Sequence, residues 1–116
     1  MTGLRSKEAE EEYREHKENG GLSKGCPLCS EKILKEFKHW KILKNRFPYD
    51  RIAQDHDMIV SMRHVKEGEL TDEEFIELRE IKNNFVFDSY QYVIESSMKQ
   101  KSIPEHFHLH LVNTKD

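Results

Sequence analysis

The sequence predicts an α+β domain with a mainly antiparallel sheet of about five strands, one long helix and a short N-terminal helix. Several short segments alternate apolar and polar residues, as half-buried strands do. One longer segment opens with a capping box and repeats apolar residues at helical spacing. These strand and helix segments do not alternate regularly, which favours an antiparallel sheet. A chain of 116 residues corresponds to one small domain.

The charge balance excludes some functions. The chain has 19 Lys and Arg residues against 22 Asp and Glu residues, a formal charge of −3. This excess argues against binding of nucleic acid through bulk positive charge. No apolar run approaches the roughly 20 residues of a membrane helix, and the charged stretch Met1–Glu18 lacks the apolar core of a secretory signal. We therefore expect a cytoplasmic protein without membrane contact.

Residues 1–24 are expected to form a charged N-terminal helix or tail, followed by the folded domain at residues 25–116. Between Arg5 and Glu18, opposite charges recur at four-residue spacing, and Gly20-Gly21 would end such a helix. The few apolar side chains in this segment favour a solvated helix over a functional one.

The first half of the domain is expected to contain a turn, a short helix and a strand. Residues 25–29, Gly-Cys-Pro-Leu-Cys, predict a tight turn. Ser30 is placed to cap a short helix that would run through Glu36. The segment Phe37–Lys44 predicts a strand with Trp40 and Ile42 on one face.

A loop and a second strand follow. Asn45–Tyr49 predicts a loop, because Pro48 has no N–H to donate to a sheet. Asp57–Arg63 alternates in the manner of a strand, with three apolar side chains on one face: Met58, Val60 and Met62.

The long helix begins at a capping box in which Thr71 is the N-cap and Glu74 its partner. The core-facing stripe that follows extends to about Val86 and comprises Phe75, Leu78, Ile81 and Phe85. A further strand is expected where three apolar residues alternate: Tyr90, Tyr92 and Ile94.

The last expected strand, Glu105–Val112, carries histidines at three alternate positions, His106, His108 and His110. On a strand these side chains share one face at about 6.5–7 Å spacing, while Phe107, Leu109 and Leu111 enter the core. Imidazoles in this arrangement suit metal binding or phosphate chemistry. The alternative is a polar strand face with incidental histidines, although solvent-facing positions seldom carry the same uncommon residue three times in a row.

The two cysteines, Cys26 and Cys29, form half of a tetrahedral zinc site. Because no second cysteine pair exists, histidines would have to complete the site. The candidates are His16, His39, His56, His64 and one end of the histidine strand. The alternatives are a redox pair, for which the βαβ context is lacking, and two unrelated core cysteines.

These residues together resemble the histidine triad (HIT) superfamily of nucleotide hydrolases and transferases. Residues 106–112 match its signature His-φ-His-φ-His-φ-φ, with φ apolar, at every position. Residues 45–49, 56–64 and 70–74 are similar to the upstream blocks of the family, in the same order. The resemblance extends over roughly residues 25–113 and implies a HIT-like fold.

The resemblance implies catalytic roles for His108 and His110. In the family, the middle histidine attacks the α-phosphate and forms a covalent nucleotidyl-histidine, which corresponds here to His108. His110 would bind the phosphate or assist the leaving group. The expected activity is hydrolysis or transfer of a nucleoside monophosphate group from a nucleoside phosphoramidate or a dinucleoside polyphosphate.

Further positions would bind the nucleotide. Asn45 occupies the family's position for a side chain that contacts the ribose hydroxyls, where an amide can donate and accept. Ser102 stands where many members carry a phosphate-binding glutamine, and would replace it as a donor. Ile42 and Leu43 would line the site of the base.

In zinc-containing relatives, the residues corresponding to Cys26, Cys29, His64 and His106 hold the metal. Two thiolates and two neutral imidazoles would neutralise Zn²⁺ in a closed, structural site. On the same resemblance, His56 supports the triad and does not bind zinc.

Two alternatives to a nucleotide hydrolase or transferase that acts through His108 remain. One is a zinc-stapled nucleotide-binding module with little or no turnover, and the other is a metalloenzyme with zinc on the three triad histidines. Both the enzyme that acts through His108 and the binding module would have a nucleotide as their partner. The resemblance also implies a possible homodimer through the helix from Asp72 and the strand from Tyr90.

Overall fold

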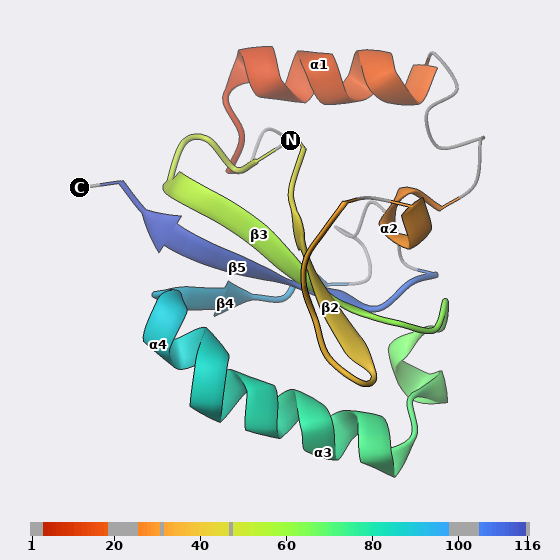
Figure 1. Ribbon diagram of the computed structural model, residues 1–116. Coiled ribbons are helices and arrows are strands. Elements are labelled where there is room, and N and C mark those ends of the chain that lie inside the picture. Colours follow the sequence, from red (N-terminus) through yellow and green to blue (C-terminus); the bar gives the residue numbers. More distant parts are fainter. Residues whose placement is uncertain (1–3, 19–25, 31, 47, 98–104, 116) are drawn as a thin grey trace.

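The structure is a computed structural model that describes residues 4–18, 26–30, 32–46, 48–97 and 105–115. Its architecture is α+β, with a five-stranded antiparallel sheet in the order β1-β2-β3-β5-β4 (Figure 1). The predicted fold class is therefore confirmed at this level. The strands are β1 (Ile33–Glu36), β2 (Trp40–Lys44), β3 (Ala53–Ser61), β4 (Tyr92–Ile94) and β5 (His108–Thr114).

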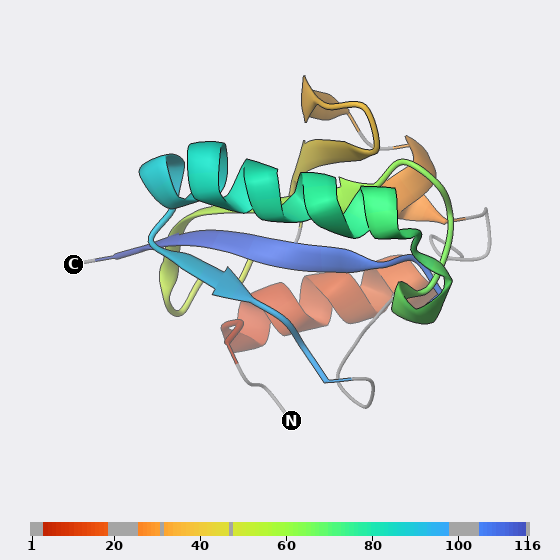
Figure 2. The same cartoon turned by 90° about the horizontal axis from the view of Figure 1, so that it is seen from below.

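The helices lie on both sides of the sheet. They are α1 (Lys7–Glu18), α2 (Pro27–Ser30), α3 (Asp72–Ile81) and α4 (Phe87–Ser89), with a 3₁₀ turn η1 at Glu67–Glu69 and a π-helical segment η2 at Lys82–Val86. α3, η2 and α4 are continuous and form one helix of 18 residues. This long helix covers one face of the sheet, and α1 lies on the opposite side (Figures 1 and 2). No helix in the described part of the chain has the length and apolar character needed to cross a bilayer.

The main core lies between the sheet and the long helix. Phe107, Leu109 and Leu111 pack there against Trp40 and Ile42, and all five are at most 5% exposed. The rings of Trp40 and Phe107 meet edge to face at 5.8 Å. The inward faces predicted for the Trp40 strand and for the histidine strand are therefore confirmed. Because side chains alternate along a strand, the histidines of β5 lie on the other face of the sheet.

Glu74 connects the start of α3 to the sheet. The predicted capping box is present: the Thr71 hydroxyl accepts from Glu74 N at 3.2 Å, and the Glu74 carboxylate accepts from Thr71 N at 2.8 Å. The same carboxylate accepts from Arg63 Nη2 at 2.6 Å, and Trp40 Nε1 donates to the Glu74 carbonyl at 2.9 Å. The hydrogen bond from Arg63 is the main reason that the pKa of Glu74 falls to about 2.

The expected helix from Ser30 to Glu36 is wrong. α2 ends at Ser30, and Ile33–Glu36 forms β1, which pairs with β2 in the register Ile33↔Leu43 and Glu36↔Lys41. The expected strand Phe37–Lys44 is shortened by the turn of this hairpin, in which Phe37 N donates to Trp40 O at 2.7 Å. Pairing between strands outweighs the local helix signal of a single capping residue.

Strand ends also differ from the expectation. β3 runs from Ala53 to Ser61, so Met62 lies beyond it and is 38% exposed. β5 begins at His108 and continues to Thr114, because its pairing with β3 extends to Ala53↔Thr114. β4 is confined to Tyr92–Ile94.

The apolar stripe of the long helix is rotated from the prediction. Phe75 is 41% exposed, whereas Glu74, Leu78 and Ile81 are buried. Glu74 takes the inward position because Arg63 and the Thr71 amide satisfy its charge. The helix also continues past Val86 to Ser89, because the π-helical segment keeps the main chain helical.

Glu74→Gln is expected to destabilise the fold by about 1–3 kcal/mol at pH 7, because the variant loses charge-assisted hydrogen bonds at a buried site. The folded-state pKa of Glu74 lies below its unfolded value, so the stabilisation is present above about pH 4.3. It is lost as the pH falls toward 2. Urea unfolding at pH 7 and at pH 2.5 should show the difference between wild type and variant shrinking. The exposed neighbour Glu73 provides the control Glu73→Gln, and an equal effect of the two variants would contradict this account.

Candidate metal and histidine site

Four side chains with metal-binding atoms converge at one end of β5. They are Cys26 and Cys29 from the α2 turn, His64 after β3 and His106 before β5, and their ligand atoms all lie within 4.8 Å of one another. Nδ1 of His106 lies 3.4 Å from Cys26 Sγ and 3.5 Å from Cys29 Sγ. Nδ1 of His64 lies 3.3 Å from Cys29 Sγ. The predicted ligand set is thus brought together.

Three sulfur–nitrogen distances in this cluster are close to those around a tetrahedral ion. With metal–sulfur bonds of about 2.3 Å and metal–nitrogen bonds of about 2.05 Å, sulfur and nitrogen ligands stand about 3.6 Å apart. The three distances of 3.3–3.5 Å agree within a few tenths of an ångström. Nε2 of His106 lies 2.7 Å from Ser61 O, which can only accept, so Nε2 carries the proton and Nδ1 presents its lone pair to the sulfurs. These residues could bind a metal ion.

The electrostatics of the cluster favour a metal over a redox pair. Burial raises the pKa of the Cys26 thiol to about 11. A reactive cysteine instead has a lowered pKa, so this thiol is a poor nucleophile unless a cation stabilises its thiolate. Burial is also the main reason that the pKa of His106 is lowered, which keeps the imidazole in the neutral form that binds metals.

The other histidines considered for this site lie elsewhere. His56 belongs to a separate network with His110. His39 precedes β2 and is not part of the cluster. The side chain of His16 lies outside the described residues.

His108 holds its proton on a defined nitrogen. Its Nδ1 lies 2.9 Å from the carbonyl oxygen of His106. A carbonyl oxygen can only accept, so Nδ1 carries the hydrogen and the lone pair is on Nε2. The neutral imidazole therefore has its nucleophilic nitrogen at the tip of the side chain.

His110 is set in the opposite tautomer by a chain of hydrogen bonds. The Tyr49 amide donates to Nδ1 of His56 at 2.9 Å, so His56 carries its proton on Nε2. That nitrogen lies 2.8 Å from Nδ1 of His110, which must accept. His110 consequently carries its proton on Nε2, 3.1 Å from the Tyr49 hydroxyl. Burial, with a smaller contribution from Arg5, lowers the pKa of His56 to about 4, so His56 is neutral at pH 7.

Asn45 and Leu43 lie on this histidine face, and Ile42 does not. Nδ2 of Asn45 lies 3.2 Å from Nε2 of His56, and Asn45 is 7% exposed. Because Nε2 of His56 carries the proton, the Asn45 amide has to be turned so that its oxygen accepts there. Leu43 packs with Met58 on the same side. Ile42 is buried beneath α3, so its expected place beside the base is wrong, because alternation along β2 turns it to the other face. Ser102 lies outside the described residues.

Tyr49 and Arg5 are components of the site that sequence reasoning missed. The Tyr49 ring lies 4.5 Å from the His56 ring and 4.8 Å from the His110 ring. The Arg5 guanidinium is 5.1 Å from the centre of the Tyr49 ring. Tyr49 stands in a motif that was visible in the sequence, but its contact with Arg5 depends on how the N-terminal segment docks.

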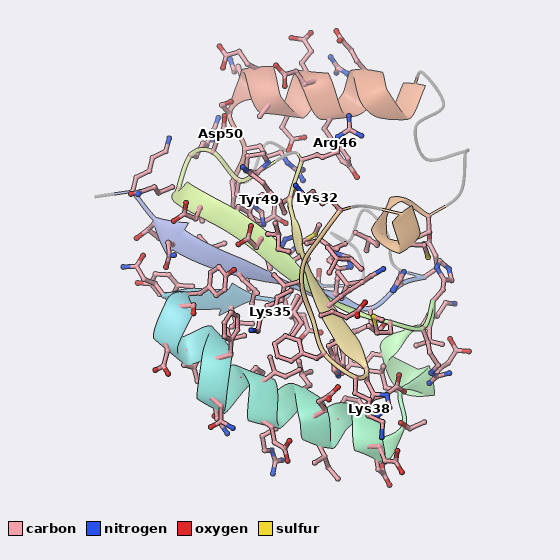
Figure 3. The ribbon with its side chains drawn as sticks, in the orientation of Figure 1. Lys32, Lys35, Lys38, Arg46, Tyr49 and Asp50 are labelled. Atoms are coloured by element: carbon pink, nitrogen blue, oxygen red, sulfur yellow. The ribbon has the colours of Figure 1, made fainter. Side chains whose placement is uncertain are left out.

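Hydrogen bonds attach this N-terminal segment to the loop between β2 and β3. Ser6 donates to the Asp50 carboxylate from its amide at 2.5 Å and from its hydroxyl at 2.6 Å. Leu4 O accepts from Arg51 N at 3.1 Å. Figure 3 shows Tyr49 and Asp50 on this loop, on the side of the sheet that faces α1. The residues just before α1 are thus attached to this loop, whereas no residue of α1 from Lys7 to Glu15 is buried, in agreement with the expected solvated helix.

Comparisons with known proteins give no assignment: no protein-family model matches the chain, and no curated protein matches it. The function must therefore be argued from the geometry of the metal cluster and the histidine face.

We expect the purified protein to contain about one equivalent of metal per chain, and a Cys26→Ser, Cys29→Ser double variant to lose it, because half of the ligand set is removed. Elemental analysis by mass spectrometry measures the metal. His39→Ala, outside the cluster, should keep the full content. Metal that persists in the double variant would place the ion on the triad histidines and contradict the four-residue site.

The stability of the fold should fall as His56 becomes protonated. Its folded-state pKa of about 4 lies below the unfolded value of about 6.5, so the neutral form is favoured in the folded state. Stability is therefore full above pH 6.5 and declines as the pH drops to 4, by roughly 2–3 kcal/mol. Urea unfolding across this range should show a shallower decline for His56→Gln, but not for His39→Gln. If wild type and His56→Gln lose stability equally between pH 6.5 and 4, protonation of His56 is not the cause of the loss.

Proposed function

We propose that this chain is a HIT-like nucleotide phosphohydrolase or nucleotidyl transferase that acts through a covalent intermediate on His108. One observation carries the proposal: adjacent imidazoles hold opposite tautomers. The lone pair of His108 and the N–H of His110 are both on Nε2, and the two rings are 5.3 Å apart. A nucleophile beside a proton donor is what a two-step displacement at phosphorus requires.

The proposed reaction begins when Nε2 of His108 attacks the α-phosphorus of the nucleotide. The bond from phosphorus to the leaving nitrogen or oxygen breaks, and the electron pair goes to that atom. A phosphate leaving group departs as an anion that accepts a hydrogen bond from Nε2–H of His110, and an amine leaving group takes its proton from solvent. The positive charge on His108 is stabilised by its Nδ1–H, which donates to the His106 carbonyl. Water or another acceptor then attacks phosphorus and loses its proton to solvent. The bond from phosphorus to Nε2 of His108 breaks, its electron pair returns to that nitrogen, and the nucleoside monophosphate is released or transferred.

Asn45 and Tyr49 suit supporting roles. The Asn45 amide, beside His56 at the end of β2, would bind the ribose hydroxyls. The Tyr49 hydroxyl contacts Nε2 of His110, where the leaving atom would have to lie. The substrate would therefore displace this hydroxyl. The donor role expected for Ser102 remains part of the proposal.

We propose that the metal is structural zinc. A pair of thiolates and a pair of imidazoles is the donor set of closed zinc sites. His106 serves two purposes in this scheme, because its Nδ1 would bind the ion while its carbonyl accepts from His108. The metal would hold the carbonyl that fixes the tautomer of the nucleophile.

A HIT-like fold and a homodimer are further parts of the proposal, and two observations support them. The sheet is antiparallel, and its edge strand β4 lies beside β5. Large apolar side chains on the expected dimer face are exposed: Phe75, Ile76, Phe87 and Tyr92.

A second function, a zinc-stapled nucleotide-binding module with little turnover, is favoured by one observation. His108 and His110 are only 6% and 5% exposed, and Tyr49 contacts His110. Slow displacement of Tyr49 would limit catalysis without preventing binding at equilibrium.

The proposal predicts a nucleotidyl adduct on His108. The metal-loaded protein is incubated with adenosine and guanosine phosphoramidates and with diadenosine polyphosphates. Intact mass spectrometry detects the adduct, and chromatography measures released monophosphate. His108→Ala should abolish both while keeping nucleotide affinity, and His39→Ala should retain both. Nucleotide binding without adduct or product in the wild type would favour the binding module.

A further inference from the structure

Lys41 is a buried lysine on the histidine face of the sheet. It is 6% exposed. In the register of the sheet it pairs with Val60 of β3, and Val60 pairs with His108 of β5. Residues paired directly across antiparallel strands project from the same face. Lys41 and His108 therefore flank Val60 in one row across three strands.

The charge of Lys41 is not neutralised by the part of the protein that the structure describes. None of those residues forms an ion pair or a hydrogen bond with its ammonium group. Glu36 stands opposite on β1, but it is exposed and makes no ion pair with Lys41. A lysine is rarely buried to this extent without a partner.

We propose that Lys41 binds a non-bridging oxygen of the nucleotide phosphate that His108 attacks. The Cα atoms of Lys41 and His108 are separated by two strand spacings, about 10 Å. Val60 is itself buried in a cluster with Leu28, Leu43 and Met58, so a shared phosphate would lie at the outer ends of the Lys41 and His108 side chains, above this cluster. This inference rests on the proposed function and adds to it a cation that the sequence resemblance does not supply.

The chemistry of the site requires such a cation. Nδ1 of His110 accepts from His56, so His110 carries no positive charge. His108 can attack only in its neutral form, because the lone pair on Nε2 is the nucleophile. A phosphate ester bound there is an anion. An ammonium group would offset its charge and stabilise the charge that develops on the equatorial oxygens during attack.

The position of Lys41 favours phosphate over the base as its ligand. Along β2 the residues on the histidine face follow the order Lys41, Leu43 and Asn45. Asn45, beside His56, is the group suited to bind the ribose. In this order it follows Leu43, so Leu43 separates it from Lys41. Lys41 is instead in register with the nucleophile.

Binding of nucleotides and nucleosides to Lys41→Met and Lys41→Arg tests the proposal. Isothermal titration calorimetry is performed with AMP and GMP, and with adenosine and guanosine, which lack phosphate. Lys41→Met should weaken the binding of the monophosphates by about 10- to 100-fold, because a charge-assisted hydrogen bond is lost. The affinity for the nucleosides should not change. Lys41→Arg should lose less affinity because it keeps the charge. Lys44→Met on the same strand is the control, since Lys44 is exposed, and it should match wild type.

Several outcomes would overturn the inference. Equal weakening of nucleosides and monophosphates by Lys41→Met would show that the residue serves the base or the shape of the site. Loss of metal from Lys41→Met would assign Lys41 to the metal cluster. Unchanged monophosphate affinity, with a wild-type adduct still formed on His108, would refute the role of Lys41 and leave the proposed function standing. A wild type that neither binds monophosphates nor forms the adduct would refute both. If Lys41→Met does not fold, Lys41→Gln replaces it in the same measurements.

Discussion

The alternation of side chains along β5 and the residues just before it is the constraint on which the rest of the structure depends. One set of residues, Phe107, Leu109 and Leu111, completes the core beneath α3. The intervening histidines are thereby directed to the opposite face and held on a backbone that pairs with β3 and β4 on its two sides. A strand at the centre of a packed core has little freedom to shift, because a register slip of one residue would exchange the two faces. Burial of the apolar set thus positions the imidazoles.

Hydrogen bonds then give each imidazole a different chemistry. Carbonyl oxygens of Ser61 and His106 accept from His106 and His108, and the Tyr49 amide donates to His56. Because these main-chain groups can only accept or only donate, they decide where each proton lies. Three similar side chains on one strand become a metal ligand, a nucleophile and a proton donor in our proposal. The metal cluster and the triad share His106, so stability of the metal site and orientation of the nucleophile are coupled.

The sequence predicted those features that depend on local period or on short motifs. The faces of β5, the capping box at Thr71 and the convergence of Cys26, Cys29, His64 and His106 agree with the structure. The β1–β2 hairpin was missed because strand pairing overrides a weak capping signal. Phe75 was misplaced because an apolar stripe does not reveal that Arg63 allows Glu74 to be buried.

Contacts between distant segments were also beyond sequence reasoning. The placement of Arg5 over Tyr49 requires the residues before α1 to dock on the β2–β3 loop through Ser6 and Asp50. Lys41 is buried because other parts of the fold cover its face of the sheet. Nearby lysines such as Lys38 and Lys44 are exposed, so the local sequence does not distinguish the buried lysine from the exposed ones. Neither arrangement is encoded in spacing along the chain.

The most direct test of the central claim is to determine the tautomers of the ring nitrogens. Long-range ¹H–¹⁵N correlation spectra of uniformly labelled, metal-loaded protein at pH 7 distinguish protonated from unprotonated nitrogens, with assignments from single His→Gln variants. The account predicts a proton on Nδ1 of His108 and on Nε2 of both His56 and His110. A proton on Nε2 of His108, or an average of both tautomers there, would contradict the claim that the fold presents a nucleophile beside a proton donor.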